Sequence, residues 1–203
     1  MLKSMLLFIL FFLHIPLDFS STKETRGCEK FNCHHSIVLV NGNGIEEDEN
    51  RIEWSEGSRL SWDDFQADPQ WWNDDIAAIT SSLIQYKYSC QNGKLNYAVK
   101  TIFLKDESWV KKKAKTTHYL IHEQLHFDIT EVFSRKLKAK LSNYEFKCND
   151  VEKFEAITKE ILTDWQNTQK RYDYQSRFSL NEAAQKKWEI FIPDILDAYS
   201  DYK

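Results

Sequence analysis

Residues 122–126 read His-Glu-Gln-Leu-His, a pattern in which two histidines stand four positions apart. On an α-helix, positions i and i+4 lie on one face, so His122 and His126 can direct two imidazoles to one metal ion. Glu123 follows the first histidine and is placed to hold and deprotonate a metal-bound water. This arrangement is typical of zinc peptidases, which also need a third protein ligand and an open position for water.

The segment around this motif has the pattern of one long amphipathic helix. Apolar residues recur at spacings of three to five between positions 121 and 137, and residues 110–141 contain no proline or glycine. We therefore expect a helix that runs through residues 110–141 and ends near Asn143. The competing interpretation is a boundary helix that carries two histidines by chance.

Strand signals precede the predicted helix. Residues 52–54 fit a short strand, and residues 77–88 and 95–103 contain alternating apolar and polar side chains. The last two segments are joined through Asn92-Gly93, the strongest short-range signal for a β-hairpin. We expect a small antiparallel sheet from these segments.

Helical signals follow the motif. Apolar residues at helical spacing predict a helix over residues 150–171 and a last helix over 181–199, interrupted or ended near Pro193. The order of elements indicates an α+β fold, with a small antiparallel sheet followed by the HExxH helix and two further helices. Such an order suits a zincin-like domain.

Several residues could support a metal site beyond the two histidines. His118 lies one turn before the motif on nearly the same helix face, so it could supply a third ligand. Glu160 belongs to a Glu-x-x-x-Asp pair on the next predicted helix and is a second candidate, although that pair equally fits a solvated helix face. Asp128 and Glu131 point away from the histidines on a continuous helix, so we expect them to support the ligands or to hydrogen bond at the core edge.

The N-terminus has the layout of a secretory signal. Lys3 precedes a nearly unbroken apolar run over residues 5–13, and polar residues follow at positions 20–22. The apolar run is short for a membrane span, and no second apolar segment approaches membrane length. We expect residues 1–21 to be a signal peptide of a periplasmic or secreted protein, with an uncleaved membrane anchor as the alternative.

Export makes the four cysteines candidates for disulfides. Cys28 and Cys33 are close in sequence and could pair, and Cys90 would then pair with Cys148, but three connectivities are possible. Residues 28–35 also contain two cysteines and two histidines that could bind zinc or copper. In an oxidising compartment, the disulfide is the favoured interpretation.

Composition and charge bound the remaining functions. The chain is 42% apolar, which is enough for a core and excludes wholesale disorder. The net charge is −4 and the densest lysine run, at residues 111–115, is typical of an exposed helix start, so we predict no nucleic-acid partner. Residues 22–50, polar and acidic toward their end, are predicted to form a mature N-terminal segment and linker before a domain at residues 51–203.

A longer set of residues resembles the bacterial domain-of-unknown-function family 922 over about residues 51–200. The matching positions are His122–Ile129, Leu60–Phe65, Ser108–Val110, Glu131, Arg135, Tyr172, Asp173, Gln185 and Trp188. Members of that family are described as zinc-dependent proteases, many of them exported. The resemblance therefore implies a zinc cofactor and a peptide or protein substrate.

One position departs from the family pattern. A histidine usually follows the Tyr-Asp pair in that family and is a natural third metal ligand, but Phe178 stands in its place here, and no histidine follows His126. Within the matched segment, Asp173 is then the other candidate for the third ligand. Tyr172 is a candidate for stabilising the oxyanion of a substrate.

Two functions follow from these residues. The first is an exported zinc-dependent metallohydrolase, a peptidase in which Glu123 is the general base for a metal-activated water. The alternative is a catalytically degenerate zincin-like binding module that lacks the family's third ligand because of Phe178. In that case Trp71-Trp72 would suit contact with a protein or glycan.

Overall fold

Residues 49–57, 59–69 and 76–203 are described by a computed structural model. The predicted signal peptide, most of the predicted linker with its Cys28–His35 cluster, and Trp71-Trp72 lie outside the described residues. The α+β class that we expected is confirmed, since a small antiparallel sheet precedes three helices.

The main sheet has three antiparallel strands in the order β1-β4-β3. They are β1 (Arg51–Glu53), β3 (Ser82–Gln91) and β4 (Lys94–Leu104). The predicted hairpin is present, because β3 pairs with β4 along its whole length from Ser82↔Phe103 to Gln91↔Lys94. Asn92 and Gly93 both have positive φ, at 53° and 77°, which matches the tight hairpin turn that Asn-Gly favours.

A second, two-stranded sheet corrects two predictions. Its strands are β2 (Ala78–Ile79) and β5 (Trp109–Val110). The strand expected over residues 77–88 is therefore split, because Ser81 leaves the line of β2 and donates its N–H to Ser108 Oγ at 2.9 Å. The helix expected from residue 110 begins only at Thr117, since Val110 pairs with Ala78 instead.

The three helices are α1 (Thr117–Ser142), α2 (Val151–Ser176) and α3 (Glu182–Ala198). Thr116 caps α1 by accepting a hydrogen bond from the backbone N–H of Tyr119. The second helix continues five residues beyond its predicted end. The prediction that Pro193 interrupts or ends the last helix is wrong: α3 runs through it, and Pro193 lies on an exposed position where water can satisfy the freed carbonyl.

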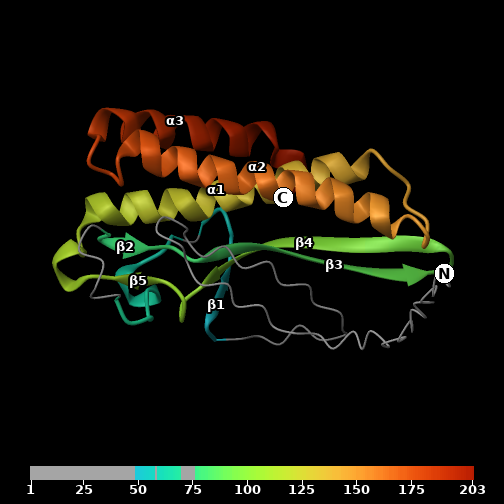
Figure 1. The fold of residues 1–203 in the computed structure, drawn as a ribbon, viewed down its shortest axis with the longest axis horizontal. Coiled ribbons are helices and arrows are strands. Elements are labelled where there is room, and N and C mark those ends of the chain that lie inside the picture. Colours follow the sequence, from blue (N-terminus) through green and yellow to red (C-terminus); the bar gives the residue numbers. More distant parts are fainter. Residues whose placement is uncertain (1–48, 58, 70–75) are drawn as a thin grey trace, which may run out of the picture. The chain divides into compact units, whose positions relative to one another are not determined.

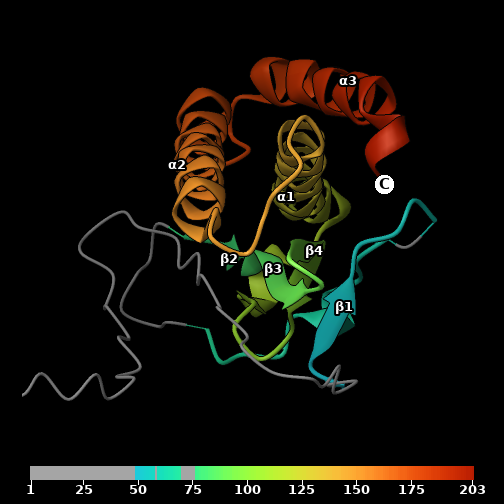
Figure 2. The same cartoon turned by 90° about the vertical axis from the view of Figure 1, so that its right-hand side faces the viewer.

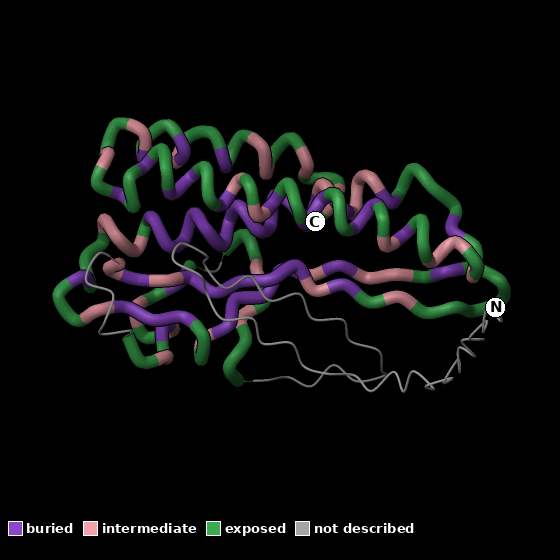
Figure 3. Tube along the Cα trace, in the orientation of Figure 1, coloured by how far each residue is buried: buried purple, intermediate pink, exposed green. Residues whose placement is uncertain are grey.

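Helix α1 occupies the centre of the described domain. All three helices lie on one face of the main sheet, with α1 next to the strands and α2 and α3 beyond it (Figures 1 and 2). Most of α1 is consequently buried along its length (Figure 3), including every residue from His122 to Arg135. The HExxH motif thus lies on a buried stretch of helix, which limits the directions of its side chains.

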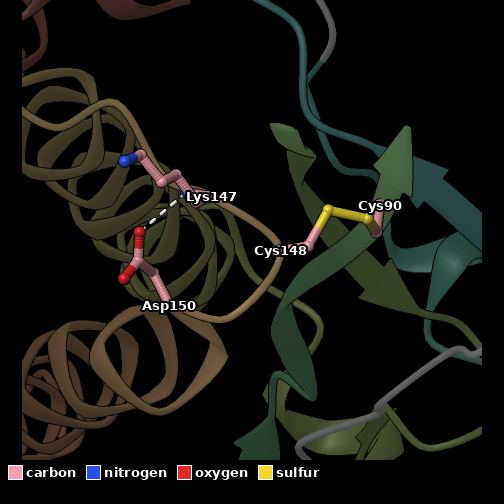
Figure 4. Close-up of a disulfide and its surroundings, with 4 residues drawn as sticks. All are labelled: Cys90, Lys147, Cys148 and Asp150. Atoms are coloured by element: carbon pink, nitrogen blue, oxygen red, sulfur yellow. Dashed lines mark hydrogen bonds between the residues drawn. A yellow bond between two sulfur atoms is a disulfide. The ribbon is translucent and has the colours of Figure 1, made fainter. Parts of the chain in front are cut away.

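A disulfide joins Cys90 to Cys148, one of the pairings that the sequence left open. It ties the end of the hairpin to the segment between α1 and α2 (Figure 4), where Lys147 N–H also donates to Asp150 Oδ2 at 2.7 Å. Among the described helices, none is long and apolar enough to cross a membrane.

Candidate metal centre

The two histidines of the motif converge on a carboxylate from α2. The Nε2 atoms of His122 and His126 lie 3.3 Å apart. Asp173 Oδ1 lies 2.9 Å from Nε2 of His126 and 3.3 Å from Nε2 of His122. All three residues are buried, and together they form a group that could hold a metal ion.

The spacing of these three atoms suits a small tetrahedral cation. Nitrogen and oxygen ligands lie about 2.0–2.1 Å from a tetrahedral zinc ion, so two such ligands are about 3.3 Å from each other. The observed separations of 2.9 and 3.3 Å are close to that value. A cation could therefore bind with little movement of His122, His126 or Asp173.

Gln169 determines which nitrogen of His126 carries the proton of the neutral ring. It lies on α2 one turn before Asp173, and its Nε2 donates to the carbonyl oxygen of His126 at 2.9 Å and to Thr130 Oγ1 at 3.1 Å. Its Oε1 therefore faces Nδ1 of His126, at 2.7 Å, as the acceptor. In the neutral ring the proton is thus on Nδ1 and the lone pair of Nε2 lies on the side of Asp173, whereas in the protonated ring Nε2 donates to Asp173.

Gln185 likewise presents its amide oxygen to Nδ1 of His122. This buried residue of α3 has its Oε1 2.8 Å from the Tyr172 hydroxyl, which donates to it, and 3.1 Å from Nδ1 of His122. The Tyr172 ring also stacks on the His122 imidazole, with the ring centroids 4.6 Å apart. The Tyr172 hydroxyl is thus bonded to Gln185, and its predicted role at the oxyanion stays a prediction.

The electrostatics of the centre favour a positive charge. Burial by itself would lower the pKa of His126, but Asp173 outweighs it and raises that pKa to about 9. Burial would raise the pKa of Asp173, yet the neighbouring His126 and His122 hold it below its ordinary value. The buried carboxylate is therefore favoured in its ionised form beside a positive charge. That charge can come from the protonated His126 imidazole or from a metal ion.

Glu123 lies at a small cavity beside the three converging side chains. The cavity has a volume of about 40 Å³, enough for water. Its lining residues are Ile76, Ala77, Ala78, Ile79, Thr80, Tyr119, His122, Glu123, His126, Asp173 and Phe178. The Glu123 carbonyl accepts a hydrogen bond from Thr80 Oγ1 at 3.2 Å, whereas its carboxylate has no hydrogen-bond partner among the described residues. That carboxylate is therefore available to a molecule in the cavity.

The other proposed third ligands lie elsewhere. His118 uses its Nε2 to contact the carbonyl oxygen of Ser179, at 2.9 Å. Glu160 forms an ion pair with Lys140, and its side chain is 60% exposed. The structure thus brings Asp173, and neither of these two residues, to the histidines.

Asp128 and Glu131 point away from the histidines, as the helical period predicted. Asp128 accepts hydrogen bonds from Trp54 Nε1 at 2.8 Å and from Arg59 Nη1 at 3.0 Å. Glu131 accepts one from Nε of the buried Arg135 at 2.8 Å. These contacts favour the interpretation of both residues as partners at the core edge.

Sequence reasoning missed Gln169 as part of the centre. The spacing Gln169-x-x-x-Asp173 places both side chains on one face of a helix, and this was the available signal. The helix predicted over residues 150–171 ends between the two residues, whereas α2 continues to Ser176. Thr130, which accepts from Gln169 and from Trp165 Nε1, was likewise missed.

Phe178, at the position where the resemblance led us to expect a histidine, lines the same cavity. It lies in the turn between α2 and α3, and 45% of its surface is exposed. Its ring contributes no metal ligand. The position thus faces the centre, while the carboxylate contact comes from Asp173, five residues earlier.

Residues 105–181 match the model of a family described as "Bacterial protein of unknown function (DUF922)". This region belongs to the DUF922 family. The match includes the whole motif, Asp173 and Phe178, and it confirms the predicted family without assigning an activity to DUF922. No curated protein and no solved structure matches the chain significantly.

Proposed function

We propose that this DUF922 protein is an exported, zinc-dependent peptidase whose active site lies in a zincin-like domain. The observation that supports it best is the convergence of three acceptor atoms, His122 Nε2, His126 Nε2 and Asp173 Oδ1, within 3.3 Å of one another. Two imidazoles and one carboxylate are a ligand set that zinc uses in catalytic sites, where the fourth position is left for water or substrate.

The residues of the chain fit a catalytic role for this ion. Zinc held there would activate water and act as a Lewis acid on a carbonyl oxygen. The Glu123 carboxylate takes a proton from the attacking water as the carbon–oxygen bond forms, and then gives it to the amine as the carbon–nitrogen bond breaks. Gln169 and Gln185 keep both imidazoles oriented during this exchange.

The edge of β2 supports a peptide as the substrate. Lys111 N–H donates to the Ala77 carbonyl, so the next residue, Ala78, turns its own N–H and C=O away from β5. Ala78 lines the cavity, and its backbone groups have no hydrogen-bond partner among the described residues. An extended peptide could pair with this edge and bring its carbonyl to the metal.

Export is supported by the disulfide. Disulfides form and persist in oxidising compartments, and the Cys90–Cys148 bond fits an extracytoplasmic location. The predicted signal peptide at residues 1–21 would deliver the chain there.

Zinc content and peptide hydrolysis test the proposal together. Purified protein is expected to retain about one zinc ion per chain and to cleave a mixture of fluorogenic peptides. Glu123→Gln should keep the zinc and lose roughly 10²–10⁴-fold in kcat, because the base is gone while the ligands remain. His126→Ala should lose both the bound zinc and the hydrolytic activity. Glu160→Gln, the same change at an exposed site of α2, is the matched control and should behave like wild type.

The outcomes separate the two candidate functions. Folded protein that takes up no zinc would contradict a metal centre. Wild-type protein that binds zinc but cleaves none of the peptides would favour the alternative suggested by Phe178, a degenerate binding module. Cleavage by Glu123→Gln at the wild-type rate would show that the activity does not use the proposed base.

A further inference from the structure

The part of the cavity wall that is not formed by the candidate ligands and Glu123 is mostly apolar. Its apolar residues are Ile76, Ala77, Ala78, Ile79 and Phe178, and Thr80 and Tyr119 complete it. No lysine or arginine lines the cavity among the described residues. A charged side chain entering this space would lose its hydration without gaining a partner of opposite charge, apart from the ligands and base themselves.

The backbone that carries Phe178 has an unusual conformation. Arg177, Phe178 and Ser179 have φ values of 50°, 54° and 69°, three successive residues in the left-handed region, and none of them is glycine. Left-handed residues that are not glycine persist where surrounding contacts enforce them, often at ligand sites. The sequence offers no glycine to relieve this turn, so its geometry depends on the contacts around it.

Contacts from α1 and α2 enforce the turn. The Phe178 N–H donates to the carbonyl of Asp173 at 3.1 Å, and Asn181 N–H donates to the carbonyl of Ser176 at 2.7 Å. His118 on α1 contacts the carbonyl oxygen of Ser179 at 2.9 Å. The backbone of Phe178 is therefore bonded to the same residue, Asp173, whose carboxylate meets the histidines.

We propose that Phe178 determines specificity, selecting peptides with an apolar side chain next to the cleaved bond. This inference rests on the function proposed above. An aromatic ring offers neither a metal ligand nor a strong hydrogen bond, so its contribution at this wall is contact with apolar groups and exclusion of water. The 45% exposed ring leaves a face that a bound side chain can cover.

Two fluorogenic peptides that differ only in the residue after the cleaved bond, leucine or glutamate, test this specificity. Wild-type protein should cleave the leucine peptide at least about 10-fold more efficiently in kcat/KM. Phe178→Ala should reduce kcat/KM for the leucine peptide by about 10-fold and leave the glutamate peptide nearly unchanged, so the ratio collapses. Phe178→Leu, which keeps an apolar side chain, should preserve most of the ratio.

Binding provides a second readout that needs no catalysis. In the Glu123→Gln background, the Kd of the leucine peptide should rise about 10-fold upon Phe178→Ala, with zinc content unchanged. Tyr174→Ala is the matched control: it removes an aromatic ring that is 83% exposed on the neighbouring helix and outside the cavity lining, and it should alter neither value.

The possible failures are distinguishable. If wild-type protein cleaves peptides with zinc bound but Phe178→Ala keeps the wild-type ratio and the wild-type Kd, Phe178 does not set specificity and the proposed hydrolase stands. A wild-type preference for the glutamate peptide would overturn the apolar selectivity in the same way. If wild-type protein cleaves neither these peptides nor the broader mixture, both proposals fail together.

Discussion

At the scale of single residues, the candidate metal centre includes side chains beyond the three that converge. Gln169 and Gln185 each present an amide oxygen to Nδ1 of a histidine, at 2.7 and 3.1 Å. Each thereby leaves Nε2 as the lone-pair atom directed at the shared point. Hydrogen bonds to the far side of a ligating imidazole fix its tautomer and orientation and raise its basicity.

Replacing Gln169 should therefore weaken zinc binding without removing a ligand. We expect Gln169→Leu to raise the Kd for zinc by about 10–100-fold, because His126 loses the acceptor that holds its Nδ1 proton. Competition with a chromophoric chelator measures this Kd. Gln166→Leu, the same change one turn earlier on α2, is the control. Equal affinity in the two variants would show that Gln169 does not orient His126.

At the scale of elements, the candidate metal centre depends on which faces of α1 and α2 pack against each other. The Trp165 indole N–H and the Gln169 amide of α2 both donate to Thr130 Oγ1 of α1, each at 3.1 Å. Trp165 itself is fully buried. These contacts set which face of α2 meets the motif, and Asp173 lies on that face. The left-handed turn that follows costs about 1–2 kcal/mol per residue, which the packing of the helices must offset.

The disulfide stabilises the other end of these elements. It links residues 58 apart in sequence, so its loss should lower the free energy of unfolding by about 2–4 kcal/mol. We expect this decrease in the double variant Cys90→Ser and Cys148→Ser, measured by urea unfolding of zinc-loaded protein. Its zinc affinity should stay at the wild-type value, because His126 precedes the end of α1 by about 24 Å at 1.5 Å per residue.

Protein treated with a mild reductant under native conditions is the control for this comparison, since it lacks the bond but keeps both cysteines. A double variant as stable as oxidised wild type would contradict the role of the disulfide. A marked loss of zinc affinity would mean that the hairpin end and the metal centre are coupled.

At the scale of the whole molecule, metal binding and folding should be linked. His122 and His126 belong to α1 and Asp173 to α2, so the three acceptors meet only in the folded domain. A ligand that binds only the folded state adds about 2.7 kcal/mol at 100 times its Kd. For a domain of this size, that corresponds to a rise in Tm of roughly 5–10 °C.

Thermal unfolding with and without zinc measures this linkage. Addition of zinc to chelator-treated wild-type protein should raise its Tm by the amount given above. The increase in Tm should be much smaller for Asp173→Ala. Glu160→Ala, which removes an exposed carboxylate of the same helix, should respond like wild type. An equal rise in all three proteins would indicate that zinc binds elsewhere.

The sequence by itself determined the features that depend on neighbours in the chain. The spacing of His122 and His126 places both on one helix face whatever surrounds them, and Asn92-Gly93 specifies the turn that joins β3 to β4. The α+β order likewise followed from local periodicity. The start of α1 could not be predicted in this way. Val110 pairs with Ala78 of β2, and the residues near Val110 in the sequence do not reveal this contact.

The third residue of the candidate metal site was decided only by the tertiary structure. His118, Glu160 and Asp173 were all compatible with the sequence, since helical period places residues on faces of their own helix but does not say how two helices rotate against each other. Packing of buried side chains between α1 and α2 determines the relative orientation of these two helices. It brought Asp173, 47 residues from His126, to the motif and left Glu160 in solvent.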